Sequence, residues 1–570
     1  MIRMHYASIL HRPRSEFAFA LDETHMVFRL RTARGDLRSV TFYYADRADM
    51  SSELPFVAAD MPLVRRDMLY DWYEYTLETR WQRIAYYFLL RDGEEECRYA
   101  GDVFEKNGAC IERAEYFQYP FNHKADIHRI PSWAREAVVY NIFPDSFANG
   151  KNAISCTGRA LDYHGHPSVS TYGGTINGII QNLDHIRLMG CNCIYLNPVF
   201  AAGAYHKYDL LDYEHIDPCF GTDEDFRNLV EAAHERGIRI IIDGVFNHIS
   251  REHPFFQNVL QNGRASEYYD WFYQLPDPLT LPEDGEEPGY VCFSYVAEMP
   301  KTNTACEALK DYFCRIGAKW IREYHVDGWR LDVANELDDG FLRAFRKAVK
   351  KEDPEAMIIG EIWENAEHYM NGDMLDSAMN YDFRRFCTQF FAEGILTAEE
   401  FDLRISGLLM RYSCQATEAQ LNLLDGHDVC RFLTLCGEDT DRMEAAIVFQ
   451  MTFPGMPCVF YGDEKGMTGK SEQEYRRPMA WRSSSPLEKV YADLIELRKT
   501  NEALTHGSFE TLMAADGLYV YRRSSGSQRI RIAINMGENG AFYEPGNRIL
   551  LQKGINCGLL LPKGYCISEE

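Results

Sequence analysis

Residues 326–332 read VDGWRLD, and residues 356–361 read AMIIGE. Each is a short apolar run that ends on a carboxylate, Asp332 in the first and Glu361 in the second. A helix-forming segment separates the two runs. Because a buried strand, a helix and a second buried strand make up the unit of a parallel sheet, the two runs predict neighbouring strands of an α/β protein.

The same alternation continues in both directions along the chain. A capping box at Thr222 and Asp225 marks the start of one of the helices. In all, eight apolar runs alternate with helices, which predicts a (β/α)8 TIM barrel. The runs lie at residues 138–143, 193–198, 238–244, 326–332, 356–362, 377–382, 421–426 and 457–463.

The segments outside this pattern predict three further parts. Residues 1–125 alternate β-forming residues with Gly and Asp turns, which is typical of a β-sandwich. Residues 247–304, rich in Pro, Gly, Asp and aromatic residues, are too long for a simple loop, so we expect a small inserted domain after strand three. Residues 501–570 return to short strands and predict a C-terminal all-β sandwich domain. The barrel itself would then comprise residues 126–246 and 305–500.

The composition restricts the partners. With 570 residues, 46% of them hydrophobic, the chain can bury several cores, as in a protein of about three to four domains. Because nucleic acid and anionic membranes repel a net charge of -26, we expect neither as a partner and a neutral substrate instead.

The first residues lack the apolar core of a signal peptide. The 16 cysteines are scattered, without a disulfide framework or zinc motif, which predicts reduced thiols in the cytoplasm.

In such a barrel, residues at the carboxyl ends of the strands converge on one pocket. Acid groups are costly to desolvate, and several of them at strand ends usually serve chemistry. Three acids hold such positions: Asp332, Glu361 and Asp428. The same strand ends also carry polar and aromatic side chains, namely Asp243, Asn247, His248, Arg330, Trp363 and His427.

Cleavage of a glycosidic bond with retention fits these acids. It needs an ionised carboxylate as nucleophile and a protonated carboxyl about 5 to 5.5 Å away. Arg330, two residues before Asp332 on the same strand face, favours a charged Asp332, and the apolar residues before Glu361 favour a protonated acid. Asp428 would hold sugar hydroxyls and oppose the charge of the transition state. The structural alternatives are a plain Arg330–Asp332 ion pair and a loop-capping role for Asp243.

Four segments carry a resemblance to a known family. DGVFNH (243–248), GWRLDVANE (328–336), GEIW (360–363) and LLDGHD (423–428) resemble the conserved regions of the α-amylase family of glycoside hydrolases, family 13, in the expected order. MPKTN (299–303) is similar to the MPKLN segment of neopullulanases, cyclomaltodextrinases and maltogenic amylases, and VANE is their form of the nucleophile region. Further segments, such as HKYDLLDYEHIDPCFG, FYGDEKG and RRPMAW, extend the similarity over nearly the whole chain.

The resemblance implies roles for the residues that match. Asp332 would be the nucleophile, Glu361 the general acid/base and Asp428 the transition-state stabiliser. Tyr208, in HKYD, would stack on the sugar in the cleaved subsite. The remaining implied roles are sugar or carboxylate binding by His248, Arg330 and His427, loop support by Asp243 and Asn247, and shaping of the leaving-group side by Trp363.

The implied activity is hydrolysis of α-1,4-glucosidic bonds in cyclodextrins, pullulan and malto-oligosaccharides through a covalent glycosyl-enzyme intermediate, with transglycosylation open. The N-terminal domain resembles a starch-binding-like module that lies over the partner's active site in a homodimer. Such a lid would exclude starch granules. A tether without contact to substrate is the alternative.

The chain also departs from the family pattern. Thr302 replaces the usual leucine of MPKLN, and Gly244 stands where alanine is common. Lys151 and Thr175 occupy positions where relatives supply oxygen ligands to calcium, and a lysine would repel the ion. We therefore expect no calcium at that site and no other cofactor.

Three other functions use the same residues. An α-glucosidase or a glucanotransferase would need the same trio of acids. A metal-dependent barrel hydrolase could use Asp243, His248, His427 and Asp428 as ligands. A catalytically inactive glucan-binding relative is disfavoured because all three acids are intact.

Overall fold

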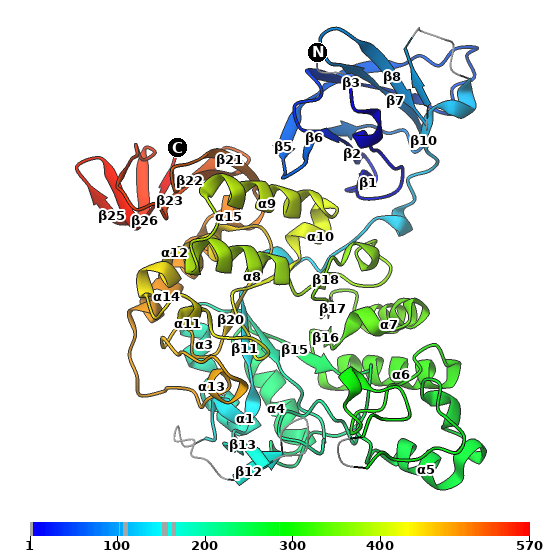
Figure 1. The fold of residues 1–570 in the computed structure, drawn as a ribbon, viewed down its shortest axis with the longest axis vertical. Helices are drawn as coiled ribbons and strands as arrows, with labels where there is room; N and C mark the ends of the chain where they lie inside the picture. The colour runs from blue at the N-terminus through cyan, green and yellow to red at the C-terminus, as the bar shows by residue number, and fades with distance from the viewer. Residues whose placement is uncertain (1–3, 102, 107–111, 151–157, 162–166, 284–285) are drawn as a thin grey trace. The chain divides into compact units, whose positions relative to one another are not determined.

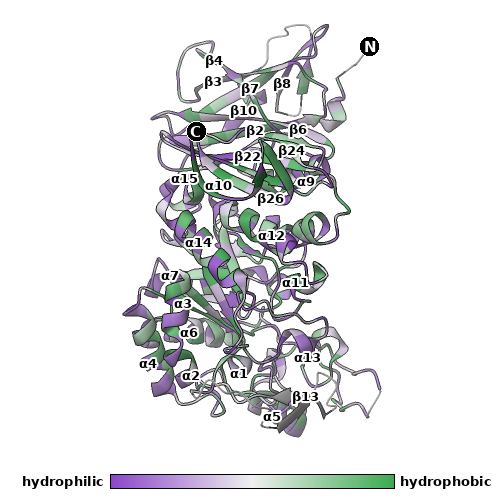
Figure 2. Cartoon of the chain, turned by 90° about the vertical axis from the view of Figure 1, so that its left-hand side faces the viewer, coloured by the Kyte–Doolittle hydropathy of each residue, from purple (hydrophilic) through white to green (hydrophobic). Residues whose placement is uncertain are grey.

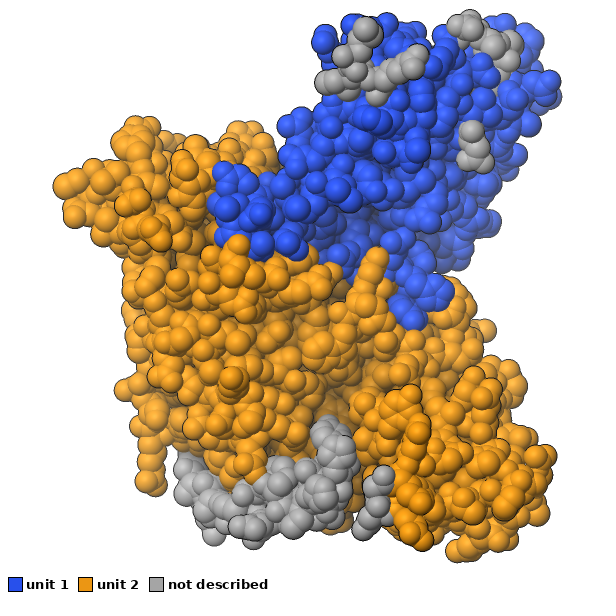
Figure 3. All heavy atoms as spheres, in the orientation of Figure 1, with its two compact units in different colours: residues 1–129, 367–372, 396–417 blue, residues 130–366, 373–395, 418–570 orange. Residues whose placement is uncertain are grey.

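The computed structural model describes residues 4–101, 103–106, 112–150, 158–161, 167–283 and 286–570. The chain forms two compact units (Figure 3). One unit comprises residues 1–129, 367–372 and 396–417, and the other comprises residues 130–366, 373–395 and 418–570.

The second unit is built on a parallel sheet of eight strands in the order β18-β17-β16-β15-β14-β11-β20-β19. The first strand, β11, pairs with the last, β20. A parallel bridge between Met379, just past β18, and Leu421 in β19 closes the sheet into the predicted (β/α)8 barrel. The strands are β11 (Val139–Ile142), β14 (Cys193–Leu196), β15 (Arg239–Gly244), β16 (Gly328–Leu331), β17 (Met357–Gly360), β18 (Ser377–Ala378), β19 (Leu421–Leu423) and β20 (Met456–Phe460).

The barrel interior is a packed core. Its strands are buried along nearly their whole length, as parallel strands covered on both faces must be. Side chains from several strands, among them Tyr195, Ile241, Ile359, Leu421 and Met456, meet in one cluster. Since this cluster fills the barrel, polar chemistry is confined to the ends of the strands.

Amphipathic helices follow the strands. Figure 1 draws α4, α6 and α7 around β15 and β16, and in Figure 2 α4 and α7 carry both hydrophilic and hydrophobic residues. The predicted capping box of α4 is present, because Thr222 Oγ1 accepts from Asp225 N at 3.1 Å and Asp225 Oδ2 accepts from Thr222 N at 2.8 Å. The main helices are α2 (Ile176–Gln181), α3 (Leu183–Met189), α4 (Asp223–His234), α6 (Glu307–Tyr324), α7 (Asp339–Glu352), α8 (Tyr381–Cys387), α12 (Thr440–Thr452) and α14 (Pro486–Thr500). Shorter elements are α1 (Pro144–Phe147), α11 (Phe432–Leu435), α13 (Glu472–Tyr475), α15 (Glu502–Thr505) and the hairpin β12 (Gly158–Leu161) and β13 (Pro167–Thr171).

The segment between β15 and α6 departs from the strand-helix alternation. Its described residues, 245–283 and 286–306, hold one helix, α5 (Pro254–Asn262), and three short 3-10 turns, Gly263–Ala265, Tyr269–Trp271 and Phe293–Tyr295. Its end returns to the barrel through an antiparallel bridge between His248 and Lys301. An aromatic group that includes Phe255, Tyr268 and Trp271 packs around α5.

The first unit is the predicted β-sandwich. Phe28 of one sheet and Phe42, Tyr86 and Phe88 of the other share a core. One sheet contains β1 (Ala18–Ala20), β2 (His25–Ala33), β6 (Tyr70–Glu78) and β5 (Leu63–Arg66). The other contains β4 (Val57–Met61), β3 (Ser39–Asp46), β7 (Ile84–Arg91), β8 (Glu96–Ala100) and β9 (Val103–Glu105), with β10 (Phe117–Tyr119) paired to β7.

Residues far along the sequence complete the sandwich unit. Helix α9 (Ala398–Met410) belongs to it, and Met410 packs against Phe17 and Trp72. The buried guanidinium of Arg29 donates to the carbonyl oxygen of Tyr412 at 2.6 Å. The compact unit therefore extends beyond the predicted limit at residue 125.

The C-terminal segment forms the predicted all-β domain, with strand order β21-β22-β23-β26-β24 and β25 paired to β26. It is joined to α12, because Tyr565 donates to Glu444 at 2.8 Å and Lys553 pairs with Asp441 at 2.7 Å. Its strands are β21 (Ser508–Ala515), β22 (Leu518–Ser525), β23 (Gln528–Asn535), β24 (Ala541–Phe542), β25 (Arg548–Asn556) and β26 (Leu559–Glu569).

Two further properties hold for the described residues. Every cysteine among them is a free thiol. Within the same described ranges, no helix has the length and apolar character needed to cross a bilayer.

Candidate active site

A cavity of about 560 Å³ opens at the carboxyl ends of the barrel strands. Its wall contains all three predicted acids: Asp332, directly after β16, Glu361, directly after β17, and Asp428, in the loop after β19. Three further residues expected at the site, Tyr208, His248 and Trp363, also line the cavity. The cavity wall is completed by Phe293, Ser294, Val296, Val333, Asn335 and Glu364.

The fully buried Arg330 stands behind the acids. One terminal nitrogen, Nη1, donates to Asp243 Oδ1 at 2.9 Å and to Asp332 Oδ1 at 2.8 Å, and the other, Nη2, pairs with Glu361 Oε2 at 2.9 Å. The sequence predicted a partnership with Asp332 alone. Instead, one cation balances three carboxylates from three adjacent strands.

The charges of this group shift the acids. Burial, followed by the nearby charge of Glu361, raises the pKa of Asp332 well above its usual value, although Arg330 opposes the shift. Burial also raises the pKa of Asp243 against the same opposing Arg330. The sequence predicted that Arg330 favours a charged Asp332. That prediction did not account for the desolvation of Asp332 or for the charge of Glu361. Asp332 therefore retains its proton to higher pH than the same acid does in water.

Glu361 is held by two donors from the surrounding loops. The backbone N–H of Val333 donates to Glu361 Oε2 at 3.0 Å, and the indole Nε1 of Trp363 donates to Oε1 at 2.9 Å. Val333 has a φ of 44°, which for a β-branched residue costs on the order of 1–3 kcal/mol. Trp363, 49% exposed, stacks on Tyr381 with ring centroids 3.9 Å apart.

Asp428 lies in a different electrostatic environment. His427 Nε2 is 2.8 Å from Asp428 Oδ2, and Arg476 Nη2 donates to Oδ1 at 3.1 Å. His427 and Arg476 outweigh burial and hold the pKa of Asp428 well below its usual value. Tyr208 stacks on His427 with the rings inclined by 7°, and its hydroxyl donates to Asp243 Oδ2 at 3.1 Å.

His248 and Asn247 occupy the end of β15. Burial lowers the pKa of His248 to about 3, so the imidazole is neutral near neutral pH. Its Nε2 lies 3.9 Å from Asp332 Oδ2, and its ring contacts Phe293 with centroids 4.8 Å apart. Asn247 is fully buried behind the wall and accepts from the ammonium of Lys301.

The structure separates the predicted residues into two groups. Asp332, Glu361, Asp428, Tyr208, His248 and Trp363 line the cavity, whereas Asp243, Asn247, Arg330 and His427 lie behind it and contact the first group or its loops.

Sequence reasoning missed three residues of this network. Tyr195 donates to Asp243 at 2.6 Å, Asn197 lies 2.9 Å from His427 Nδ1, and Arg476 binds Asp428. Tyr195 and Asn197 follow the rule for strand ends and could have been found by it. Arg476 lies in a loop 48 residues from Asp428, and although it opens the RRPMAW segment, the rule for strand ends does not reach it.

The positions considered for metal ions have other partners. Arg330 contacts Asp243 and Asp332, and a guanidinium there would repel a cation bound by Asp243, His248, His427 and Asp428. Elsewhere, Thr175 caps α2 by accepting from Gly178 N at 3.0 Å. Lys151 lies outside the described residues. In the described ranges, no group of three or more His, Cys, Asp or Glu residues has a geometry that could hold a metal ion.

Comparison with known families agrees with this geometry. Residues 141–486 match the family model for the α-amylase catalytic domain, and residues 4–123 match the model for the α-amylase N-terminal Ig-like domain. The chain belongs to the α-amylase family. It is therefore a glycoside hydrolase, as the resemblance of its motifs implied.

Individual relatives cover almost the whole α-amylase-family chain. It is 39% identical to a cyclomaltodextrinase of Geobacillus thermopakistaniensis (strain MAS1), over 94% of this chain and 92% of the relative. It is 38% identical to neopullulanase 2 of Thermoactinomyces vulgaris, over 93% of this chain and 90% of the relative. A solved structure of a cyclomaltodextrinase superposes with a TM-score of 0.90 at 33% identity, covering 99% of both chains.

Replacing Arg330 tests the charge balance of the site. Arg330→Met should lower the free energy of unfolding by about 3–5 kcal/mol, because three buried carboxylates lose their shared cation. The loss should be larger at pH 8 than at pH 5. A carboxyl whose pKa is raised in the folded state binds its proton more tightly there than in the unfolded chain, so its contribution to stability declines as the pH rises through that pKa.

Denaturant unfolding at both pH values measures this difference. Arg346→Met is the control, because Asp376 would keep the ammonium of Lys350 at 2.8 Å. An Arg330→Met loss that is the same at pH 5 and pH 8 would contradict the assigned charge balance.

Proposed function

We propose that this glycoside hydrolase cleaves α-1,4-glucosidic bonds with retention, in two displacements. Asp332 attacks the anomeric carbon while Glu361 gives its proton to the departing glycosidic oxygen, which leaves a covalent glycosyl ester on Asp332. Glu361 then takes a proton from water, and the resulting hydroxide attacks the anomeric carbon and frees Asp332. Asp428, kept ionised by His427 and Arg476, faces the positive charge that develops on the sugar ring.

The shared guanidinium of Arg330 is the observation that carries this proposal. Asp332 and Glu361 bind opposite terminal nitrogens of one planar group, so they lie close together on one wall. That arrangement suits retaining enzymes, whose carboxyls are about 5 to 5.5 Å apart, better than inverting enzymes, which need about 6.5–9.5 Å for a water.

Glu361 has to carry a proton before the first step, in which it gives that proton to the glycosidic oxygen. The raised pKa of Asp332 favours a proton on that carboxyl, while Glu361 accepts from Val333 and Trp363. A bound sugar presents its glycosidic oxygen, an acceptor, to Glu361, which stabilises the protonated form of Glu361. Substrate binding thus completes the arrangement of charges that the reaction needs.

The cavity lining suits a glucan chain. Tyr208 offers a flat ring, Trp363 is half exposed at the rim, and the neutral His248 has an Nε2 without a hydrogen-bond partner among the described residues. Rings pack on sugar faces and a neutral imidazole donates to a hydroxyl. Together with the names of the relatives, this supports cyclodextrins, pullulan and malto-oligosaccharides as substrates, with transglycosylation when a sugar replaces water as acceptor.

The substrate proposal is tested by incubating the enzyme with β-cyclodextrin, pullulan and soluble starch. Proton NMR of the first products should show the α-anomer, and chromatography should show panose from pullulan. Asp332→Asn should lower turnover on all three substrates by on the order of 10³-fold or more while the Tm stays near that of wild type. A β-anomer as first product would contradict retention, and near-normal turnover by Asp332→Asn would contradict the nucleophile.

We also propose that the chain forms a homodimer through its N-terminal unit and works in the cytoplasm. Apolar side chains exposed by 39–66% are concentrated in residues 57–69, on β4, on β5 and in the turn after β5: Val57, Leu63, Val64, Met68 and Leu69. β4 and β5 are edge strands of the two sheets, and exposed apolar residues on edge strands commonly mark an interface. The free thiols of the described cysteines support a reducing compartment.

A charge placed within this apolar segment tests the dimer. Leu69→Glu should convert a dimer to a monomer in sedimentation or light-scattering measurements, because an unpaired charge in an interface is costly. Leu188→Glu, which replaces a residue of α3 that is 74% exposed, is the matched control. A monomeric wild-type protein, or an unchanged mass for Leu69→Glu, would contradict the proposed interface.

We further propose that no calcium binds near Asn149. Thr175 already uses its hydroxyl oxygen as a helix cap, and a lysine at sequence position 151 is a cation that cannot serve as a calcium ligand. Elemental analysis after dialysis against calcium should therefore find less than one Ca²⁺ per chain, and EDTA should leave both rate and Tm unchanged. A stoichiometric, chelatable ion whose binding is lost in Thr175→Val would overturn this proposal.

A further inference from the structure

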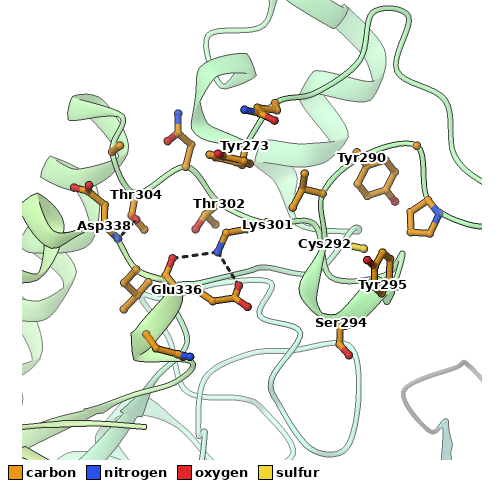
Figure 4. A pocket seen from close by; sticks show the side chains of 18 residues that line it. Tyr273, Tyr290, Cys292, Ser294, Tyr295, Lys301, Thr302, Thr304, Glu336 and Asp338 are labelled. Carbon is orange, nitrogen blue, oxygen red and sulfur yellow. Dashed lines mark hydrogen bonds and ion pairs between the residues drawn. The ribbon is translucent and has the colours of Figure 1, made fainter. Parts of the chain in front are cut away.

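A lysine in the inserted segment makes a three-oxygen contact close to the nucleophile. The ammonium of Lys301 donates to the carbonyl oxygen of Glu336 at 3.2 Å and to its Oε2 at 3.0 Å, and it also contacts Asn247 Oδ1. Figure 4 shows the two contacts with Glu336 from the side of a second cavity, which Lys301 lines. Only 15% of the Lys301 side chain is exposed.

The three groups come from different parts of the barrel unit. Asn247 follows β15, Glu336 ends the turn after β16, and Lys301 belongs to the segment before α6. The backbone around Lys301 is itself fixed to the end of β15, because Thr302 N donates to Asn247 O at 3.0 Å and the Thr302 hydroxyl donates to Phe246 O at 2.6 Å. The ammonium therefore holds the turn after β16 to a fixed support.

That turn carries the nucleophile at one end and Glu336 at the other. Val333 has left-handed backbone angles, a conformation that persists only where its surroundings hold it. In this conformation its N–H reaches Glu361, and the next N–H, of Ala334, donates to the Glu361 carbonyl at 3.0 Å. A turn that relaxed at Glu336 would withdraw both donors from Glu361.

We infer that Lys301 is a positioning residue for catalysis: by fixing Glu336 to Asn247, it holds the turn after Asp332 so that Val333 donates to the acid/base, Glu361. This role rests on the proposed function, because Glu361 has to be the proton donor for the contact to affect the rate. Lys301 acts through the turn, since it lines the second cavity and the trio lines the first.

The exposure of the Lys301–Glu336 ion pair and the position of the Val333 N–H indicate whether kcat, KM or Tm should change when Lys301 is replaced. Glu336 is half exposed, so its ion pair with Lys301 adds little to stability. The position of the Val333 N–H, in contrast, acts directly on the group that gives the proton. Loss of the ammonium should therefore affect kcat more than Tm and more than KM.

Lys319 offers a matched control. Its ammonium also contacts both the carbonyl and the carboxylate of one glutamate, Glu214, and its side chain is 22% exposed. It extends from α6 and does not line either of the two cavities. Lys319→Ala thus removes a similar contact without disturbing the turn after β16.

The first experiment compares full-length wild type, Lys301→Ala, Lys301→Arg and Lys319→Ala on the substrate that wild type hydrolyses fastest. Lys301→Ala should lower kcat by about 10- to 100-fold with KM changed by less than about threefold, as for a misplaced catalytic group. Lys301→Arg, which keeps a cation, should recover part of the rate, and Lys319→Ala should match wild type. A raised KM at normal kcat, or a normal rate in Lys301→Ala, would overturn the inference.

The backbone N–H of Val333 donates to the Glu361 carboxyl and stabilises its charged form, which gives a pH readout. The alkaline limb of the kcat profile should move to higher pH in Lys301→Ala, because the ionised form of the acid loses a donor. The limb should stay in place in Lys319→Ala. An unmoved limb in Lys301→Ala would contradict the route through Val333.

A third measurement does not depend on activity. Trp363 donates to Glu361, so in protein labelled with 5-fluorotryptophan the fluorine resonance of Trp363 reports on that carboxyl. The variant Trp363→Phe identifies this resonance among those of the 8 tryptophans. The resonance should shift in Lys301→Ala and not in Lys319→Ala. If the resonance does not shift in Lys301→Ala, the positioning role is overturned whatever the activity. If it shifts but the wild-type protein hydrolyses no α-glucan, only the proposed function is overturned.

Discussion

The burial of Arg330 constrains everything else at the site. A guanidinium with no exposure to water must be surrounded by acceptors, and here they are carboxylates from β15, β16 and β17. Strand register brings them together, since Asp243 is directly opposite Arg330 in the neighbouring strand and Glu361 follows the residue opposite Leu331. A slip of one residue in either pairing would turn a carboxylate away from the cation. The charge balance and the barrel register therefore specify each other.

The barrel and its loops contribute different properties. The strands fix the positions of Asp332 and Glu361 within a rigid core, while loops adjust how each acid is solvated and hydrogen-bonded. Asp428 shows the effect most clearly. Its neighbours His427 and Arg476 lower its pKa, whereas Asp332, buried beside another acid, has a raised pKa. Three carboxyl groups on one cavity wall thus acquire different proton affinities from their neighbours.

The sequence predicted those features that depend on local patterns. The eight strands were found because each is a short apolar run, and the acids because each ends such a run. The partners of the acids were harder to predict. Arg476 and Lys301 reach their acceptors from loops 48 and 54 residues away, and no periodicity encodes a loop contact. The same limit explains the assignment of Arg330 to Asp332 alone: spacing within a strand reveals a neighbour at i+2, but not those across the sheet.

The composition of the first unit has a consequence for how the protein is made. Its β-sandwich includes residues 396–417, and Arg29 and Met410 show that these residues contribute buried contacts. The ribosome delivers that segment roughly 290 residues after the sandwich strands have emerged, which is about 15 to 60 s at 5–20 residues per second. Until then, the apolar surface around Phe17 and Trp72 lacks its covering helix. The unit at the start of the chain is thus completed late, and a chaperone that shields this surface would act during the synthesis of the barrel.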